Sequence, residues 1–164
     1  MGGPDRRAAA GEARIGVDVR TEIEIARSRG DVFSYASEPA NATEWYENIK
    51  AVEWKSPPPL AVGSRIAFTA QFLGRQLTYT YEVADLLDGE RLVMRTAEGP
   101  FPMETTYTWV DAGSGTRMTL RNRGEPSGFS KLAAPMMARA MRRANQQDLE
   151  RLRRTLEVPA PVPR

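Results

Sequence analysis

The sequence predicts an α+β fold in which a seven-stranded antiparallel sheet curves around one long C-terminal helix, with two short helices between the first and second strands. Two patterns support this prediction. Apolar and polar residues alternate over seven segments between residues 17 and 124, the period of strands with one buried face. Residues 130–157 instead repeat their apolar residues with the period of an amphipathic helix. Only this helix is long enough to cover the apolar face of the sheet, so we expect the two to pack together.

The chain of 164 residues, 41% of them hydrophobic, is long enough to bury a core as one domain. Residues 1–16 are rich in Gly, Ala and Arg, so we expect a disordered leader there. The domain itself is expected over 17–157, beginning with a strand at 17–25. A flexible tail over 158–164 is expected to follow it.

Two short helices are predicted after the first strand. Asp31 follows a glycine and is a suitable N-cap for a helix over 31–38, which Pro39 ends. Asn41 is a suitable cap for a second helix over 41–48. The bulky aromatic residues of this second helix are expected to close one end of a cavity.

Six further strands are predicted, each separated from the next by a proline or glycine turn signal. Short turns make consecutive strands antiparallel neighbours. A single helix cannot fill the concave side of a strongly curved sheet, so a hollow is expected between the two. The expected strand ranges are 49–56, 63–72, 75–87, 91–97, 102–110 and 116–124.

The final helix is expected to begin at Pro135, because a missing N–H costs nothing in the first turn. From there it runs about 22 residues and about 33 Å. If the residues before Ala134 are also helical, the proline bends or restarts the helix. The methionines and alanines of its first half are either ordinary core packing or a soft surface that adapts to a guest. The apolar arc consists of Ala133, Met137, Ala140, Met141, Ala144, Leu152 and Leu156.

Charge is balanced over the whole chain, at a formal +2, but not over its last helix. Residues 131–156 hold seven basic residues and two acidic ones. This basic face is either a solvated helix surface or a surface that makes transient contact with an anionic partner. We expect no nucleic-acid binding, and oligomeric state is left open.

The chain contains neither cysteine nor histidine. Their absence excludes Ser-His-Asp and Cys-His catalysis, and zinc or haem sites that need these ligands. We therefore expect no metal and no cofactor. The sequence contains no apolar run long enough to span a membrane and nothing like an export signal, so a soluble cytoplasmic protein without stable membrane insertion is expected.

A mainly apolar ligand pocket is predicted between the final helix and the concave face of the sheet. Strand parity and helix periodicity turn its members toward one another, and tyrosine hydroxyls add polar groups. Trp45 or Tyr46 is expected near its mouth. The predicted ligand-binding residues are Trp45, Tyr46, Phe68, Phe72, Tyr79, Tyr81, Tyr107, Met118, Met137, Met141, Ala144 and Asp148.

Asp148 stands near the middle of the apolar arc, where a charge is costly unless it is paired. One interpretation is structural: the carboxylate accepts hydrogen bonds from a nearby backbone or an arginine and fixes the helix in place. The other is functional: it orients a ligand or acts as a base. Glu104 raises the same question, but its parity predicts that it points outward.

The order of elements and several local phrases resemble the SRPBCC superfamily, the START-like or polyketide cyclase/dehydrase group with the helix-grip fold. The phrases are RGDVFSYASEPANATEWY at 29–46, GSR at 63–65, Gly115-Thr116-Arg117, and the stretch from GFSKLAAPMM to the end of the final helix. The resemblance covers about residues 17–157. It implies a helix-grip fold, and it carries over no catalytic residue. Iron-binding oxygenase members use histidine, which this chain lacks.

Two functions from different classes follow. The first is binding or carriage of a small hydrophobic or aromatic molecule, lipid-like or polyketide-like. The alternative is a cofactor-free cyclase or dehydratase that works with carboxylate and tyrosine groups. Turnover of a bound ligand would separate the two.

Overall fold

The structure, a computed structural model, describes residues 16–72, 74–125 and 134–159, apart from the side chain of Phe72. Nearly all of the expected leader, and the end of the expected tail, lie outside these ranges. The segment just before the final helix does so too. The predicted bend at its start therefore stays a prediction.

Seven strands form one antiparallel sheet in the order β1-β7-β6-β5-β4-β3-β2. This confirms the predicted sheet, and each strand end lies within two residues of its expected position. Each strand from β2 to β7 pairs with the next one along the chain, and the first strand pairs with the last. The strands are β1 (Val17–Ile25), β2 (Ile49–Trp54), β3 (Arg65–Phe72), β4 (Arg75–Leu87), β5 (Arg91–Glu98), β6 (Met103–Ala112) and β7 (Gly115–Gly124).

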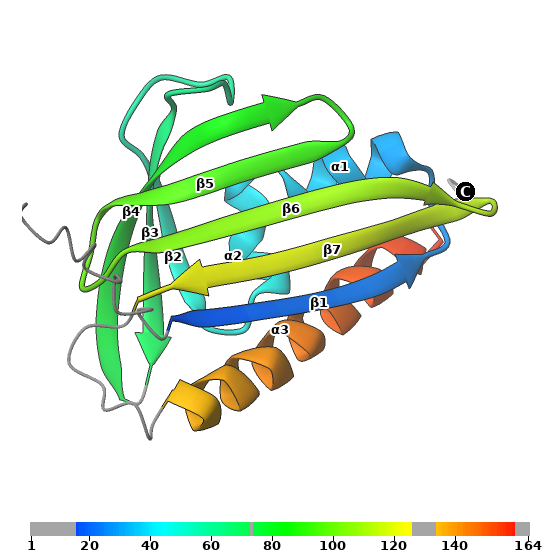
Figure 1. The fold of residues 1–164 in the computed structure, drawn as a ribbon. Helices are drawn as coiled ribbons and strands as arrows, with labels where there is room; N and C mark the ends of the chain where they lie inside the picture. Colours follow the sequence, from blue (N-terminus) through cyan, green and yellow to red (C-terminus); the bar gives the residue numbers. More distant parts are fainter. Residues whose placement is uncertain (1–15, 73, 126–133, 160–164) are drawn as a thin grey trace, which may run out of the picture.

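The sheet is strongly curved, and the helices lie on its concave side (Figure 1). The strands β2, β3 and β4 run across the direction of β1, β6 and β7, so the sheet wraps partly around the helices. The helices are α1 (Arg29–Ala36), the short 3-10 turn η1 (Pro39–Asn41), α2 (Ala42–Trp45) and α3 (Ala134–Glu157). This arrangement is the predicted helix-grip fold of the α+β class.

The caps of the short helices differ from the prediction. Ser28, not Asp31, caps α1, and its Oγ accepts a hydrogen bond from the Asp31 N–H at 3.2 Å. Asp31 lies inside the first turn and instead accepts from Arg27 at 3.1 Å. Asn41 occupies the N-cap position of α2, but its side chain makes no capping bond and donates from Nδ2 to the carbonyl oxygen of Tyr35 at 3.1 Å. Short polar side chains bond to whichever backbone group lies nearest. The predicted Asp31 cap was therefore wrong, whereas the predicted N-cap position of Asn41 is confirmed without a capping bond from its side chain.

The C-terminal half of α3 is fixed firmly to the sheet. Leu152 is fully buried in the main hydrophobic core. Arg27, just beyond β1, donates from Nη1 to the carbonyl oxygen of Leu156 at 2.7 Å. The N–H of Ala26 donates to Glu157 Oε1 at 2.8 Å. The first bond satisfies a carbonyl group that a helix end leaves open, and both bonds hold the end of α3 against the end of β1.

The outer face of the sheet carries cross-strand ion pairs. Glu104 on β6 points outward as predicted, and it pairs with Arg95 at 2.8 Å and with Arg123 at 2.5 Å. Asp18 on β1 pairs with Arg121 on β7 at 2.6 Å. Opposite charges on neighbouring strands stabilise the pairing modestly and leave the outer face close to neutral.

Candidate functional site

The hydroxyl groups of Tyr46 and Tyr107 meet on the inner face of the sheet, with their oxygens 2.6 Å apart. The alternation of β6 turns Tyr107 inward, and Tyr46 follows the end of α2. Burial raises the pKa of Tyr107 and also that of Tyr46, on which the negative field of Asp148 acts in the same direction. Both groups are therefore neutral phenols at physiological pH, able to donate and to accept hydrogen bonds.

Aromatic rings surround the two hydroxyls. The Trp45 ring lies 3.9 Å from that of Tyr46, centroid to centroid, and edge-on to Tyr107 at 6.3 Å. Trp109 stacks on Tyr107 at 6.0 Å. Among the described residues, neither indole Nε1 has a hydrogen-bond acceptor, although both atoms are buried. Of the two residues expected near a pocket mouth, Trp45 lies in the core and is 1% exposed, whereas Tyr46 is half-buried.

Asp148 is the buried carboxyl group of this region, at 5% exposure. Its Oδ1 accepts a hydrogen bond from the backbone N–H of Glu47 at 3.1 Å, which ties α3 to the residue after Tyr46. Burial raises the pKa of Asp148 to about 6, against the lowering effects of the Glu47 bond and the Arg151 charge. The bond fits the structural interpretation, and the raised pKa leaves the group able to exchange a proton near neutral pH.

A chain of amide and hydroxyl groups crosses the inner face beside α3. Asn145 Nδ2 donates to Asn122 Oδ1 at 2.6 Å, and Asn122 Nδ2 donates to Thr105 Oγ1 at 2.9 Å. The pKa of Tyr81 is raised overall by burial, although its hydrogen bonds with Thr96 and Thr105 act in the opposite direction. Sequence reasoning did not select these partners of Asn145. The sequence feature that could have indicated Asn122 and Thr105 is a polar residue at an inward position of a strand.

The predicted wall residues of the sheet occupy its inner face. Phe68 and Met118 are buried, and Tyr81 and Tyr79 are half-buried. The Phe68 and Tyr81 rings lie 5.9 Å apart, and those of Tyr79 and Tyr81 lie 6.3 Å apart. The predicted role of Phe72 concerns a side chain outside the described residues. These described residues therefore lie on one face of the sheet, as strand parity predicts.

The buried face of α3 is rotated away from the predicted arc. Met137 and Met141 are half-buried, but Ala140 and Ala144 are exposed, so the expectation that Ala144 faces the sheet was wrong. Asn145, which is not part of the predicted arc, is buried instead. Alanine buries little apolar area, so it cannot set the orientation of the helix. Buried leucines and the polar contacts of Asn145 set it.

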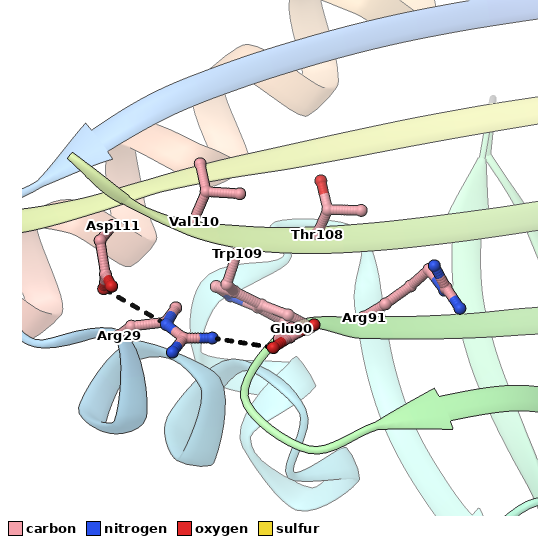
Figure 2. Close-up of a pocket in the computed structure, with 7 residues that line it drawn as sticks. All are labelled: Arg29, Glu90, Arg91, Thr108, Trp109, Val110 and Asp111. Atoms are coloured by element: carbon pink, nitrogen blue, oxygen red, sulfur yellow. Dashed lines mark hydrogen bonds and ion pairs between the residues drawn. The ribbon is translucent and has the colours of Figure 1, made fainter.

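Two surface grooves lie elsewhere. The first, of about 380 Å³, is lined by Arg29, Glu90, Arg91, Thr108, Trp109, Val110 and Asp111. Figure 2 shows the Arg29 guanidinium between two acids, Asp111 at 3.2 Å and Glu90 at 3.7 Å, so its charge is already neutralised. A second groove, of about 320 Å³, is lined by Arg65, Glu82, Ala84, Arg95, Thr96 and Ala97. Neither is the predicted hollow between α3 and the sheet, which stays a prediction.

A comparison with protein families identifies the chain. Residues 16–157 match the family described as polyketide cyclase / dehydrase and lipid transport. The chain belongs to this family. The predicted membership of the SRPBCC superfamily is thereby confirmed. A comparison of this polyketide cyclase/dehydrase family member with curated proteins finds no match.

Solved structures similar to this family member share its fold at low sequence identity. A Thermus thermophilus protein matches with a TM-score of 0.74 at 20% identity, over 85% of this chain and 96% of that one. A START superfamily protein from Mycobacterium smegmatis also gives 0.74, at 16% identity over 85% and 97%. The di-domain ARO/CYC StfQ of the steffimycin pathway gives 0.72, at 13% identity over 88% of this chain and 51% of that one. Identities this low establish the fold and no shared activity.

Within the described ranges, no group of three or more acidic side chains lies close enough together to hold a metal ion. In the same ranges, no helix is both long enough and apolar enough to cross a membrane. The polar groups described on the inner face of the sheet are phenols, the buried carboxyl group of Asp148, amides and indole N–H donors. Such a set can bind a ligand by stacking and hydrogen bonding, and it can also move a proton.

Proposed function

We propose that the chain binds or carries a small hydrophobic or aromatic molecule between α3 and the inner face of the sheet. The observation that carries this proposal is the cluster of aromatic rings around the Tyr46 and Tyr107 hydroxyls. Rings supply apolar area for stacking, and the hydroxyls fix the orientation of a guest. The family description, which includes lipid transport, and the START superfamily neighbour support the same proposal.

The guest that suits this site carries oxygen atoms on an apolar skeleton. The indole N–H groups of Trp45 and Trp109 are buried donors without an acceptor among the described residues. A buried donor left without an acceptor costs about 1–3 kcal/mol, so a carbonyl or ether oxygen that reached either would bind favourably. An aromatic ketone or a polyketide-like molecule combines the two features.

The helix contributes an adaptable surface to the site. Met137 and Met141 are half-buried on the side of α3 that faces the sheet. Methionine is unbranched and polarizable, so it adjusts to guests of different shape. The first half of α3 holds these side chains less tightly than the leucine-rich second half holds its own.

A matched pair of substitutions on neighbouring helix positions tests the proposal. Met141→Trp fills space on the half-buried side of α3, whereas Ala140→Trp adds the same ring on the exposed side. We expect the fluorescence of anilinonaphthalene sulfonate to rise with the unmodified protein and with Ala140→Trp, and to fall roughly tenfold with Met141→Trp. Circular dichroism checks that both variants keep their fold. Equal dye uptake by the two variants, or no uptake by the unmodified protein, would contradict the proposal.

A second candidate function is a cofactor-free cyclase or dehydratase, favoured by the buried carboxyl group of Asp148. Its pKa of about 6 suits a group that takes up and releases a proton near neutral pH. The Tyr46 hydroxyl, whose pKa the Asp148 charge helps to raise, supplies a donor for a ligand carbonyl. Asp148 would act as the base and Tyr46 as the hydrogen-bond donor.

Native mass spectrometry of the purified protein separates the two functions. Asp148→Asn preserves the shape of the side chain and removes its proton exchange. If the chain only carries its ligand, the unmodified protein and the variant retain the same small molecule. If it is an enzyme that cyclises and dehydrates its substrate, the variant retains a molecule that is one water heavier than the product retained by the unmodified protein.

A further inference from the structure

The first half of α3 presents an exposed face that is basic and carries one large apolar side chain. Arg139, Arg142 and Arg143 are exposed, and Met136 is 76% exposed, more than any other large apolar residue of the described chain. Residues 134–147 contain no acidic residue. This face therefore joins positive charge to a protruding thioether on one regular helix.

The three arginines lack acidic partners within the described part of the chain. Most arginines on the outer face of the sheet form an ion pair, and Arg153 in the second half of α3 pairs with Glu150 at 2.5 Å. The strand along which α3 lies offers no neutralising charge, because its alternation turns Asp18, Glu22 and Glu24 to the outer face. The field of the three guanidinium groups is thus left open to solvent.

We propose that this face of α3 docks on the surface of an anionic lipid bilayer. Each arginine near such a surface strengthens binding roughly fivefold, so three contribute about a hundredfold. A helix that lies in the interface inserts apolar side chains among the headgroups, which is the role of Met136. The partial positive charge at the start of α3 acts in the same direction.

The shape of the face favours a bilayer over an acidic protein. It is a convex helix surface with small exposed side chains, Ala140 and Ala144, beside its arginines. A protein partner needs a complementary surface with a buried centre. A bilayer needs only charge and a side chain that reaches below the headgroups. The opposite side of the same helix segment holds Met137 and Met141, so docking would bring a bilayer to the half of α3 that is less tightly packed.

Vesicle sedimentation with the full chain tests the proposal. The probes are vesicles of phosphatidylcholine alone and vesicles of equal parts phosphatidylcholine and phosphatidylserine. The variant carries Arg139→Gln, Arg142→Gln and Arg143→Gln. Its matched control carries Arg65→Gln, Arg117→Gln and Arg121→Gln, the same change of net charge on the outer face of the sheet. All six positions are exposed, and thermal unfolding checks that each protein is folded.

We expect the unmodified protein to sediment with the anionic vesicles and not with the neutral ones. The helix variant should lose at least tenfold in apparent partition constant, and the control less than threefold. Met136→Ser in the otherwise unmodified protein should also weaken binding to the anionic vesicles, without changing the salt dependence of that binding. Equal binding by the helix variant and the control would overturn the proposal. So would binding to polyglutamate without binding to vesicles, which would assign the face to an acidic protein.

Discussion

Tyr46 and Tyr107 join their hydroxyl groups at 2.6 Å although 61 positions separate them in the chain. One comes from the end of α2 and the other from the middle of β6, so the bond links the short helices to the sheet. Both phenols are held neutral by burial. The pair is thus at once a structural contact and the polar centre of the proposed ligand site.

The first prediction concerns the energetic coupling of this pair. Tyr107→Phe removes one hydroxyl and leaves that of Tyr46 buried without this partner, so we expect a loss of about 1–2 kcal/mol in the free energy of unfolding. Tyr46→Phe should cost a similar amount. The double variant should cost about 1 kcal/mol less than the sum, because no orphaned hydroxyl remains.

Urea unfolding of the four proteins measures this coupling. Tyr35→Phe is a suitable control, because the hydroxyl of Tyr35 bonds to Glu44 at an exposed site. Its removal should cost less than either single change in the core. Additive losses in the double variant would show that the two hydroxyls are not energetically coupled.

The second prediction concerns the pH dependence that Asp148 imposes. Its pKa is about 6 in the folded chain, against an ordinary value of 3.8 for an aspartate side chain, so the folded state binds the proton more tightly. Asp148 therefore costs the folded state no stability below about pH 4. Between about pH 4 and pH 6 the cost of burying its ionised carboxylate grows, to on the order of 2–3 kcal/mol. Stability due to this group falls as pH rises.

Asp148→Asn removes the penalty while its side-chain oxygen can still accept the bond from Glu47. We expect the variant to match the unmodified protein near pH 4 and to exceed it by about 1–3 kcal/mol near pH 7. The difference between the two urea curves isolates Asp148 from Asp18 and Glu104, whose arginine partners lower their pKa values and give the opposite pH trend. A difference that is constant with pH would show that the Asp148 pKa is not raised.

The third prediction concerns the amide chain under α3. Asn145→Ala leaves Asn122 without its donor on the inner face, and we expect a loss of about 1–3 kcal/mol. Gln146→Ala, at the next and exposed position, should change stability by less than about 0.5 kcal/mol. Equal losses of stability from both changes in urea unfolding would mean that the hydrogen bond between Asn145 and Asn122 adds nothing beyond helix propensity.

Much of the fold could be predicted from local pattern. Alternation in β1, in β4 and in β7 gave the strands and their inward faces, since a period of two fixes which side each residue takes. Short turns gave the antiparallel order. The inward positions of Phe68 and Tyr107 followed from the same parity, because it needs no knowledge of what lies opposite.

The rotation of α3 and the polar contacts were decided by tertiary structure. Periodicity placed Ala144 on the buried arc, but leucine packing and the contact between Asn145 and Asn122 turned it outward. The partner of Asp148 is a backbone N–H more than a hundred positions away, which no local pattern encodes. Sequence alone determined what each segment forms and which side is apolar. Only the assembled chain determined how the helix is turned, since that depends on which distant groups satisfy its polar side chains.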